Sequence, residues 1–279
     1  MNNNLGVLSS NIKSFDFIFK NNLNDLLNLY SIACRNIQDS KKLSLKYKFK
    51  KYYGSYEEFI EDNNIDFVIN FLPPEIKFEY TYLLLKANKK VIIDYPLINS
   101  INDISFVDEI FNSSLSKNLF LVDNYNFKKL KSLNIKNFLY IKTPFKNYSK
   151  LSPTTKNLLN EESPDLIYLI NEFKKSKIKI SILDKNIHNS YNKLLYLNAF
   201  INIDNDIKIN VIIDNLNSLN SKFIINNNGK KEYNSETQTP TNLFNYQDLI
   251  EFIKNNKSFE KDAFFQYYPF KLFNEVINE

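Results

Sequence analysis

The chain contains a single arginine, Arg35, although 36 of its 279 residues are lysine or arginine. Arg35 lies in the run IACRN (32–36), directly after an apolar segment at 29–33 that is typical of a buried strand. A guanidinium binds a phosphate through two parallel hydrogen bonds, which a lysine ammonium does not do. Arg35 is therefore a candidate phosphate ligand, and an ordinary surface arginine is the alternative.

A second candidate phosphate site is the loop SSNIKS (9–14), between an apolar run at 5–8 and a segment with helical spacing. A glycine-rich loop at such a place lets the backbone approach a pyrophosphate at the N-terminus of the helix. Here Ser9, Asn11 and Ser14 stand at the three glycine positions of a G-x-G-x-x-G pattern. These side chains are small or tolerate left-handed backbone, so the loop is compatible with phosphate. An ordinary polar loop is the alternative.

Nucleophilic and metal chemistry have little support in this sequence. Cys34 is the only cysteine and His188 the only histidine, which argues against a transition-metal site. We expect Cys34 to be a small buried residue and His188 to lie in a loop between strands, with catalytic roles as the alternatives. Tyr125 and Asn126, after the last strand of the first half, either face a ligand or pack at a domain junction.

Strands and helices alternate through the first half of the chain. Strands are predicted at 5–8, 29–33, 52–54, 66–71, 90–93 and 119–122, and helices at 15–27, 40–49, 56–60, 75–87 and 100–113. Continuous apolar strands separated by helices are typical of parallel βαβ units. We therefore expect an α/β protein with an N-terminal Rossmann-like, doubly wound parallel sheet. Ser55 is expected to cap its helix by accepting from the amide of Glu58.

The second half is predicted to differ. Strands are expected at 137–143, 178–183, 194–203, 207–214 and 223–227, and helices at 164–173, 246–254 and 263–277. Apolar and polar residues alternate in several strands, as at 208–212, which is typical of an antiparallel sheet with one covered face. We predict a Rossmann-like dinucleotide-binding domain at 1–124 and an α+β domain with an open antiparallel sheet at 125–279.

Composition excludes several classes of protein. The net charge of +5 is mild and the lysines are interspersed with acids, so we expect no nucleic-acid partner. No run of 18 apolar residues occurs, so we expect no membrane span. One cysteine and no visible secretory signal favour a reducing, cytoplasmic location. Only three glycines occur, which we interpret as drift toward A- and T-rich codons.

Residues 28–125, and above all 52–100, resemble the Gfo/Idh/MocA family of oxidoreductases. That family shows a run of the form "y.s.eell....iD.V.i.tPn..H.......l.aGkhV..EKP". The matching elements here are Tyr53, Tyr56-Glu57-Glu58, Ile65-Asp66-Phe67-Val68, Leu72-Pro73-Pro74, Ala87-Asn88-Lys89-Lys90-Val91 and Asp94-Tyr95-Pro96. The resemblance implies a nicotinamide cofactor, a hydride transfer to or from a small-molecule substrate, and a homodimer formed through the open sheet.

The same resemblance implies which residues contact the cofactor. The expected cofactor-binding residues are Ser9, Ser10 and Asn11 at the pyrophosphate, Leu72 and Pro73 at the nicotinamide ribose, and Asp94 and Pro96 in the signature segment. In this fold the residue at the end of the second strand contacts the adenosine ribose, and an arginine nearby accommodates a 2′-phosphate. Arg35 therefore favours NADP, with NAD as the less favoured cofactor.

The chain departs from the family pattern at positions that bear on chemistry. The signature E-K-P becomes Asp94-Tyr95-Pro96, the histidine after the t-P-n turn falls on Lys77, and a later H-x-x-D motif becomes Glu162-Ser163-Pro164-Asp165. A tyrosine, with a pKa near 10, is a poor base and a reasonable proton donor, which favours the reductive direction. Biliverdin reductases, with an E-Y-P run, and thiazolinyl imine reductases are similar relatives.

These observations leave two functions open. The first is an NADP-dependent reductase that transfers a hydride from NADPH to a small carbonyl or imine. Its predicted catalytic residues are Tyr95 as proton donor, with Lys77, Glu162 and Asp165 completing the pocket. The second is a binding or scaffold protein that keeps the fold but has lost the chemistry, with or without loss of the cofactor. Its motive is the absence of the loop glycines, the signature lysine and the later histidine.

Overall fold

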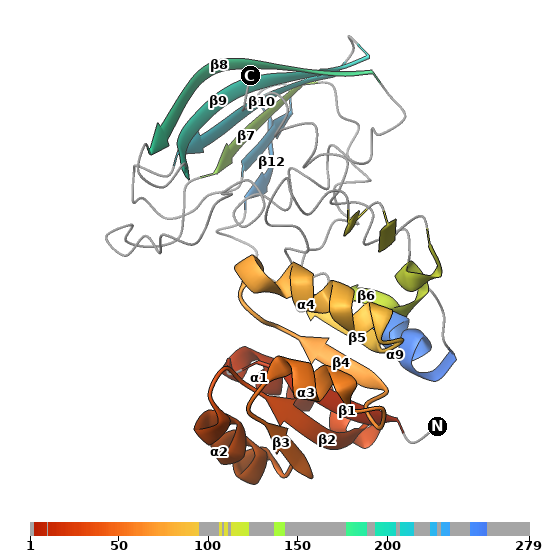
Figure 1. The fold of residues 1–279 in the computed structure, drawn as a ribbon. Helices are drawn as coiled ribbons and strands as arrows, with labels where there is room; N and C mark the ends of the chain where they lie inside the picture. Colours follow the sequence, from red (N-terminus) through yellow and green to blue (C-terminus); the bar gives the residue numbers. More distant parts are fainter. Residues whose placement is uncertain are drawn as a thin grey trace. The chain divides into compact units, whose positions relative to one another are not determined.

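The computed structural model describes residues 3–9, 11–94, 106–107, 109–110, 113–122, 137–142, 177–188, 193–204, 207–214, 224–227, 230–234 and 246–255. The chain contacts divide it into two compact units, shown in Figure 1. Unit 1 comprises 1–97, 105–123 and 245–264, and unit 2 comprises 98–104, 124–244 and 265–279. No helix in the described part is long and apolar enough to cross a membrane.

Unit 1 is built on a six-stranded sheet with the strand order β3-β2-β1-β4-β5-β6. Its strands are β1 (Asn4–Leu8), β2 (Asn28–Ala33), β3 (Lys51–Tyr53), β4 (Phe67–Asn70), β5 (Lys90–Asp94) and β6 (Leu119–Val122). Every neighbouring pair is parallel. The strand order reverses between β1 and β4, so the carboxyl ends of these two strands form the switch point of a doubly wound sheet. The predicted Rossmann-like fold is confirmed.

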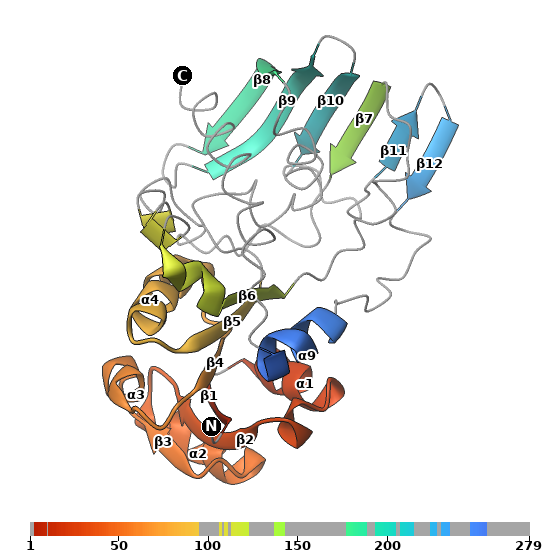
Figure 2. The ribbon, with the colours of Figure 1, turned by 90° about the vertical axis from the view of Figure 1, so that its right-hand side faces the viewer.

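Helices cover both faces of this sheet. They are α1 (Ile12–Lys20), the 3-10 turn η1 (Leu23–Asp25), α2 (Ile37–Tyr47), α3 (Tyr56–Glu61), α4 (Pro74–Lys86), the 3-10 turn η3 (Ser114–Asn118) and α9 (Tyr246–Asn255). Figure 2 shows α3 and α4 on one side of the sheet and α1 and α9 on the other. The Ser55 hydroxyl caps α3 by accepting from the Glu58 amide at 3.1 Å, as predicted.

Several elements end where a non-glycine residue adopts a left-handed backbone. Asn22 has φ 51°, which ends α1 before the predicted limit at residue 27. Lys48 has φ 61° after α2, and Asn88 has φ 61° after α4. Asn88 stands where the family pattern has the glycine of "aGkhV", and asparagine is among the residues that best tolerate this conformation. The loss of glycines is thus partly compensated by asparagine.

Gly6, in the middle of β1, is a glycine that packing requires. An added Cβ there would lie 2.4 Å from the Phe59 ring, which is fully buried on the inner face of α3. The surrounding core consists of the apolar β1, β4 and β5 residues, among them Val7, Val68 and Ile92, each with no exposed surface. Close packing of α3 on β1 fixes the central strands whose carboxyl ends carry the candidate site.

Helix α9 joins unit 1 although it lies far beyond residue 124, the domain boundary predicted from the sequence. Its buried face consists of Leu249, Phe252 and Ile253. The Phe252 ring lies 5.3 Å from the ring of Phe120 on β6 and 6.4 Å from that of Phe67 on β4. Apolar burial against the sheet therefore brings this segment back to the N-terminal fold.

Unit 2 contains a second six-stranded sheet, with the order β12-β11-β7-β10-β9-β8. Its strands are β7 (Asn137–Lys142), β8 (Ile178–His188), β9 (Lys193–Ile203), β10 (Ile207–Asp214), β11 (Ile224–Asn227) and β12 (Lys230–Asn234). All pairs are antiparallel except β7 with β10, which are parallel. The α+β class is confirmed, with this one pair as a departure, because a long intervening stretch of chain lets β7 and β10 run in the same direction.

Two details of unit 2 correct the sequence predictions. Strand β8 was expected to end at Leu183, but it continues to His188, which pairs with Lys193. The prediction of His188 in a loop is therefore wrong. Strand β12 was not predicted, because its sequence Lys230–Asn234 is mostly polar and charged and lacks the apolar signal of a buried strand.

Candidate active site

The loop between β1 and α1 places Ser9 and Asn11 at the carboxyl edge of the parallel sheet. The Ser9 side chain is buried, and its hydroxyl accepts a hydrogen bond from the Asn11 amide at 2.9 Å. Ser14, in the first turn of α1, is fully buried, and its hydroxyl has no hydrogen-bond partner in the described part of the chain. Helix α1 thus presents its N-terminus at the switch point, where an anion is favoured.

The side chain of Phe15 is turned away from this loop. Its ring stacks on Tyr47 of α2 at a centroid distance of 4.1 Å and meets the edge of Phe49 at 6.4 Å. Phe15 therefore fills the space between α1 and α2. The positions at which a dinucleotide fold has glycines hold only Ser9, Asn11 and Ser14, so no bulky side chain takes them.

Arg35 lies beside the same loop, at the end of β2. The Cys34 thiol donates to the Ser9 carbonyl oxygen at 3.4 Å, which ties the residue before Arg35 to the β1–α1 loop. The Cys34 amide donates to the Ser40 hydroxyl at 2.8 Å, and Asn36 caps α2 by accepting from the Gln38 amide. These bonds fix the short connection on both sides of Arg35.

The Arg35 side chain itself is exposed and forms no ion pair with any described residue. The pKa of the Tyr56 hydroxyl is raised, mainly by burial, while the positive charge of Arg35 lowers this pKa. The guanidinium is thus close to Tyr56, the first residue of α3, at the carboxyl edge of the sheet. A fixed backbone with an unpaired guanidinium is an arrangement that suits an incoming phosphate.

Cys34 is 1% exposed, as predicted for a small buried residue. Burial, the largest influence, raises the pKa of its thiol, while the hydrogen bond with Ser40 acts in the opposite direction. A thiol with a raised pKa has little thiolate at neutral pH, so its contact with Ser9 is structural.

The loop after β4 carries Leu72 and Pro73. Leu72 is buried, and its amide donates to the Asn70 side-chain oxygen at 3.3 Å. The Asn70 amide group donates to the Lys77 carbonyl at 3.0 Å and to the Thr81 hydroxyl at 2.9 Å. Asn70 thereby holds the loop against α4. Sequence reasoning missed its role, although a polar residue that ends the apolar strand FVIN was a usable signal.

Lys77 and Asp94 form an ion pair at the carboxyl ends of β4 and β5. The Lys77 ammonium donates to the Asp94 carboxylate at 2.5 Å and to the Asp94 carbonyl oxygen at 3.3 Å. The Lys77 side chain is 2% exposed and that of Asp94 is 32% exposed. From the sequence, Lys77 was predicted to be catalytic and Asp94 to bind the cofactor. A contact between the two was not predicted.

The described residues thus bring most of the candidates to one edge of one sheet. They are Ser9, Asn11, Arg35, Leu72, Pro73, Lys77 and Asp94. The other candidates lie outside the described residues, namely Ser10, Tyr95, Pro96, Glu162 and Asp165, and so do Tyr125 and Asn126.

Comparison with known proteins agrees with this geometry. Residues 10–120 match the family model described as "Oxidoreductase family, NAD-binding Rossmann fold", which is that of Gfo/Idh/MocA proteins. Residues 10–120 are thus similar to Gfo/Idh/MocA proteins. The resemblance inferred from the DYP segment and its neighbours is thereby confirmed. None of the curated protein sequences matches this chain.

Solved structures of similar fold include Gfo/Idh/MocA oxidoreductases. A dehydrogenase (MviM) from Clostridium difficile superposes with a TM-score of 0.72 at 16% identity, covering 100% of this chain and 99% of that one. A biliverdin reductase from Synechocystis sp. PCC 6803, solved with biliverdin and NADP+, gives 0.70 at 12% identity, with coverages of 100% and 99%. Myo-inositol 2-dehydrogenase from Lactobacillus plantarum gives 0.72 at 11%, with 100% and 97%. At these identities the likeness shows the shared fold.

The residues present fit the NAD(P) group that the Gfo/Idh/MocA domain binds. The N-terminus of α1 supplies favourable backbone dipoles, and the buried Ser14 hydroxyl lacks a partner in the described part of the chain. Ser9, Asn11 and Ser14 are small side chains, the Cys34 thiol ties the residue before Arg35 to the loop, and the Arg35 guanidinium forms no ion pair with any described residue. Ser9, Asn11 and Arg35 would thus hold the phosphates, while Leu72 and Pro73 lie at the next strand of the switch point.

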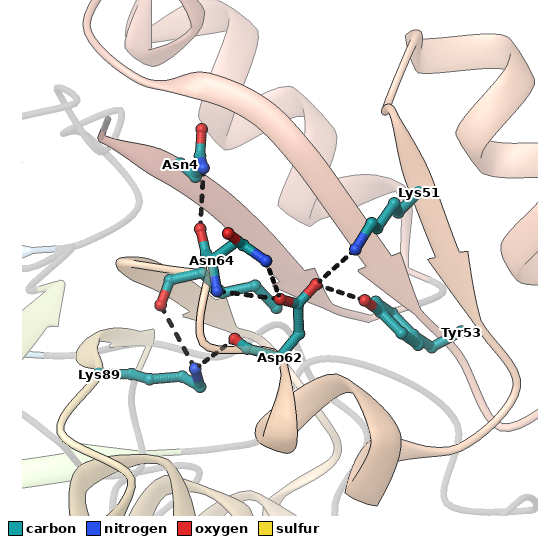
Figure 3. Close-up of polar contacts among 7 residues, drawn as sticks. Asn4, Lys51, Tyr53, Asp62, Asn64 and Lys89 are labelled. Carbon is teal, nitrogen blue, oxygen red and sulfur yellow. Dashed lines mark hydrogen bonds and ion pairs between the residues drawn. The ribbon is translucent and has the colours of Figure 1, made fainter. Parts of the chain in front are cut away.

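A second cluster of polar residues lies at the opposite, amino edge of the same sheet (Figure 3). The Asp62 carboxylate accepts hydrogen bonds from the Lys51 ammonium at 3.1 Å, the Tyr53 hydroxyl at 2.5 Å and the Asn64 amide at 2.9 Å. The buried Lys89 ammonium donates to the Asp62 and Ile65 carbonyl oxygens at 2.8 and 3.3 Å.

The charges of this cluster are satisfied internally. Burial opposes ionisation of Asp62, but the hydrogen bonds from Tyr53, Asn64 and Lys51 together hold the pKa of its carboxyl well below the ordinary value. Burial and the bond to Asp62 raise the pKa of Tyr53 to about 12. Each group is engaged with another group of the fold, so we interpret the cluster as a structural link between β3 and the α3–β4 connection.

We expect Asp62→Asn to lower the free energy of unfolding by about 2 kcal/mol at pH 7, because it weakens bonds to a charged acceptor. Since the folded pKa of Asp62 lies below that of the unfolded chain, its stabilisation is present above about pH 4 and is lost as the pH falls further. Urea unfolding at pH 7 and pH 3.5 measures both effects. If the unaltered protein and Asp62→Asn differed in free energy of unfolding by the same amount at both pH values, this interpretation would be contradicted.

Proposed function

We propose that this chain is an NADP-dependent reductase that transfers a hydride from NADPH to a small carbonyl or imine carbon. The family of residues 10–120 supplies the reaction class. The observation that carries the cofactor preference is Arg35, which follows a residue tied to the β1–α1 loop and whose exposed guanidinium forms no ion pair within the described part of the chain. The biliverdin reductase of the same fold, solved with NADP+, supports this choice.

The roles of the binding residues follow from their places on the sheet. Arg35, after β2, would bind the 2′-phosphate through two hydrogen bonds. Ser9, Ser10 and Asn11, after β1, would hold the pyrophosphate at the N-terminus of α1. Leu72 and Pro73, after β4, would contact the nicotinamide ribose, and Asp94 and Pro96 would border the nicotinamide.

The bound NADPH would supply the hydride, and the chain would supply the proton and the electrostatic setting. We assign proton donation to Tyr95, because a phenol is a reasonable donor near neutral pH. Lys77, Glu162 and Asp165 would complete the substrate pocket. In a carbonyl reduction Tyr95 would give its proton to the substrate oxygen, and in an imine reduction to the substrate nitrogen.

Residues 125–279 would bind the substrate and form a homodimer. In β9, Leu197, Ala199 and Ile201 are fully buried on one face, whereas Phe200 on the other face is 37% exposed. That second face is the candidate dimer surface. The single cysteine of the chain also supports action in a reducing, cytoplasmic compartment.

A catalytically inactive binding protein is the alternative, and one observation favours it. The Ser9 hydroxyl already accepts the Asn11 amide, which is a donor that a pyrophosphate would otherwise use. In that alternative the loop is a closed polar turn, and the fold serves an interaction without redox chemistry.

Thermal stabilisation separates the two functions. A ligand that binds only the folded protein at 100 times its Kd adds about 2.7 kcal/mol to the free energy of unfolding. We expect NADPH to raise the melting temperature of the purified chain clearly more than NADH at equal concentration. No rise with either dinucleotide would overturn the proposed reductase and favour the inactive binding protein.

A further inference from the structure

Lys77 is an unusual lysine, because its charged group is buried at the carboxyl edge of the sheet, where the candidate ligand-binding residues lie. Its side chain is 2% exposed, whereas Lys86 on the same helix is 47% exposed. Removing an ammonium from water is unfavourable unless a counter-charge is close. The counter-charge is the carboxylate of Asp94, the last residue of β5. Its Oδ1 lies 2.5 Å from the Lys77 Nζ.

Hydrogen bonds other than this ion pair also hold α4 in place. Asn70 anchors α4 through the Lys77 carbonyl in its first turn and through the Thr81 hydroxyl further along the helix. The Thr81 hydroxyl donates to the same Lys77 carbonyl at 2.8 Å. These bonds use the backbone of Lys77, so its ammonium is left for Asp94, whose carboxylate accepts at 2.5 Å and whose carbonyl oxygen accepts at 3.3 Å.

The position of the pair indicates which half of a dinucleotide it would affect. A doubly wound sheet consists of two mononucleotide-binding halves that meet at the switch point. Arg35, on the β1–β3 half, would take the adenosine phosphate, so the nicotinamide belongs over the half that contains β4 and β5. Lys77 and Asp94 lie at the carboxyl ends of these two strands.

The nicotinamide ring is neutral in NADPH and positively charged in NADP+. A nearby charge therefore changes the binding affinity of NADP+ relative to that of NADPH. We propose that the Lys77–Asp94 ion pair sets the preference of this site for the reduced over the oxidised cofactor. The Lys77 charge offsets that of the Asp94 carboxylate, which would otherwise stabilise the positive ring of NADP+. The inference rests on the proposed function, because it requires that the chain binds NADP(H).

The test is the ratio of two dissociation constants, Kd for NADPH and Kd for NADP+, measured by calorimetry. Lys77→Met keeps the length and apolar stem but leaves the Asp94 charge uncompensated, so the ratio should shift about tenfold toward NADP+. Asp94→Asn leaves the Lys77 charge, so the ratio should shift about tenfold toward NADPH. A tenfold shift is the expected effect of one unit charge on the charged nicotinamide ring at a distance of roughly 10 Å and an effective dielectric constant near 20.

Opposite shifts distinguish this role from a purely structural one. Loss of structure would weaken binding of both cofactor forms, and it would do so in the same direction in both variants. Lys77→Arg keeps the positive charge, so it should keep the ratio of the unaltered protein. The double variant Lys77→Met with Asp94→Asn removes both charges, so its ratio should return to that of the unaltered protein. Lys86→Met is the matched control, because it removes an exposed charge from the same helix and should leave the ratio unchanged.

Two negative results have different meanings. If the unaltered chain binds neither NADPH nor NADP+, the proposed function fails and the inference fails with it. If both forms bind but neither Lys77→Met nor Asp94→Asn changes their ratio by more than twofold, the proposed function stands and this inference alone is overturned. Should Lys77→Met not fold, Asp94→Asn still decides, because a shift toward NADP+ or no shift contradicts the inference.

Discussion

Arg35→Ala is expected to weaken NADPH binding by about 10- to 100-fold while leaving NADH binding nearly unchanged. A hydrogen-bonded contact to a charged group contributes about 1.5–3 kcal/mol, which corresponds to this range of affinity. NADH lacks the 2′-phosphate, so it makes no contact that the substitution removes. The guanidinium is exposed and unpaired in the described part of the chain, so its loss should not affect folding.

The affinity of each variant is best measured by fluorescence titration with both reduced dinucleotides. Arg35→Lys keeps the charge but not the two parallel hydrogen bonds, so it should recover only part of the NADPH affinity. Lys20→Ala is the matched control, because Lys20 is an exposed cation in the last turn of α1, away from the carboxyl edge of the sheet. Equal losses in Arg35→Ala and Lys20→Ala would mean that Arg35 acts only as a surface charge.

Phe252→Ala is expected to lower the stability of unit 1 by about 3–5 kcal/mol, the usual cost of removing a buried phenylalanine ring. Phe252 has no exposed surface, and its ring packs between Phe120 on β6 and Phe67 on β4. The substitution would leave a cavity under the half of the sheet that carries Lys77 and Asp94. Circular dichroism during urea unfolding measures the loss.

The same experiment tests the assignment of α9 to the N-terminal fold. Tyr246→Ala is the matched control, because Tyr246 is an exposed aromatic residue on the same helix. It should change stability by less than about 0.5 kcal/mol. If Phe252→Ala were as mild as Tyr246→Ala, α9 would not be an integral part of the core of unit 1.

The parallel sheet of unit 1 was predictable from the sequence because its strands are short, apolar and separated by helices. The segments FVIN and KVIID each read as a buried strand, and Ser55 marked the start of α3. The run of matching elements from Tyr53 to Pro96 indicated the family resemblance. Local pattern was sufficient in these places, since each element carries its own signal.

Other features depend on contacts between residues that are distant in sequence. The ion pair of Lys77 with Asp94 joins a helix to the end of the next strand, and no local pattern indicates which lysine is buried. Packing of α9 on β6 and β4 joins positions more than 100 residues apart. The left-handed Asn88 shows a further limit, because an asparagine at the glycine position of the family pattern hides this backbone geometry from a motif search based on glycine.

The central claim is that unit 1 binds NADPH with its 2′-phosphate on Arg35, and a crystal structure of the chain grown with NADPH tests it most directly. We expect the 2′-phosphate within about 3 Å of the Arg35 guanidinium nitrogens, the pyrophosphate at the N-terminus of α1, and the nicotinamide over the carboxyl ends of β4 and β5. A β1–α1 loop that remains closed by the Ser9–Asn11 hydrogen bond, with no dinucleotide bound at saturating NADPH, would contradict it.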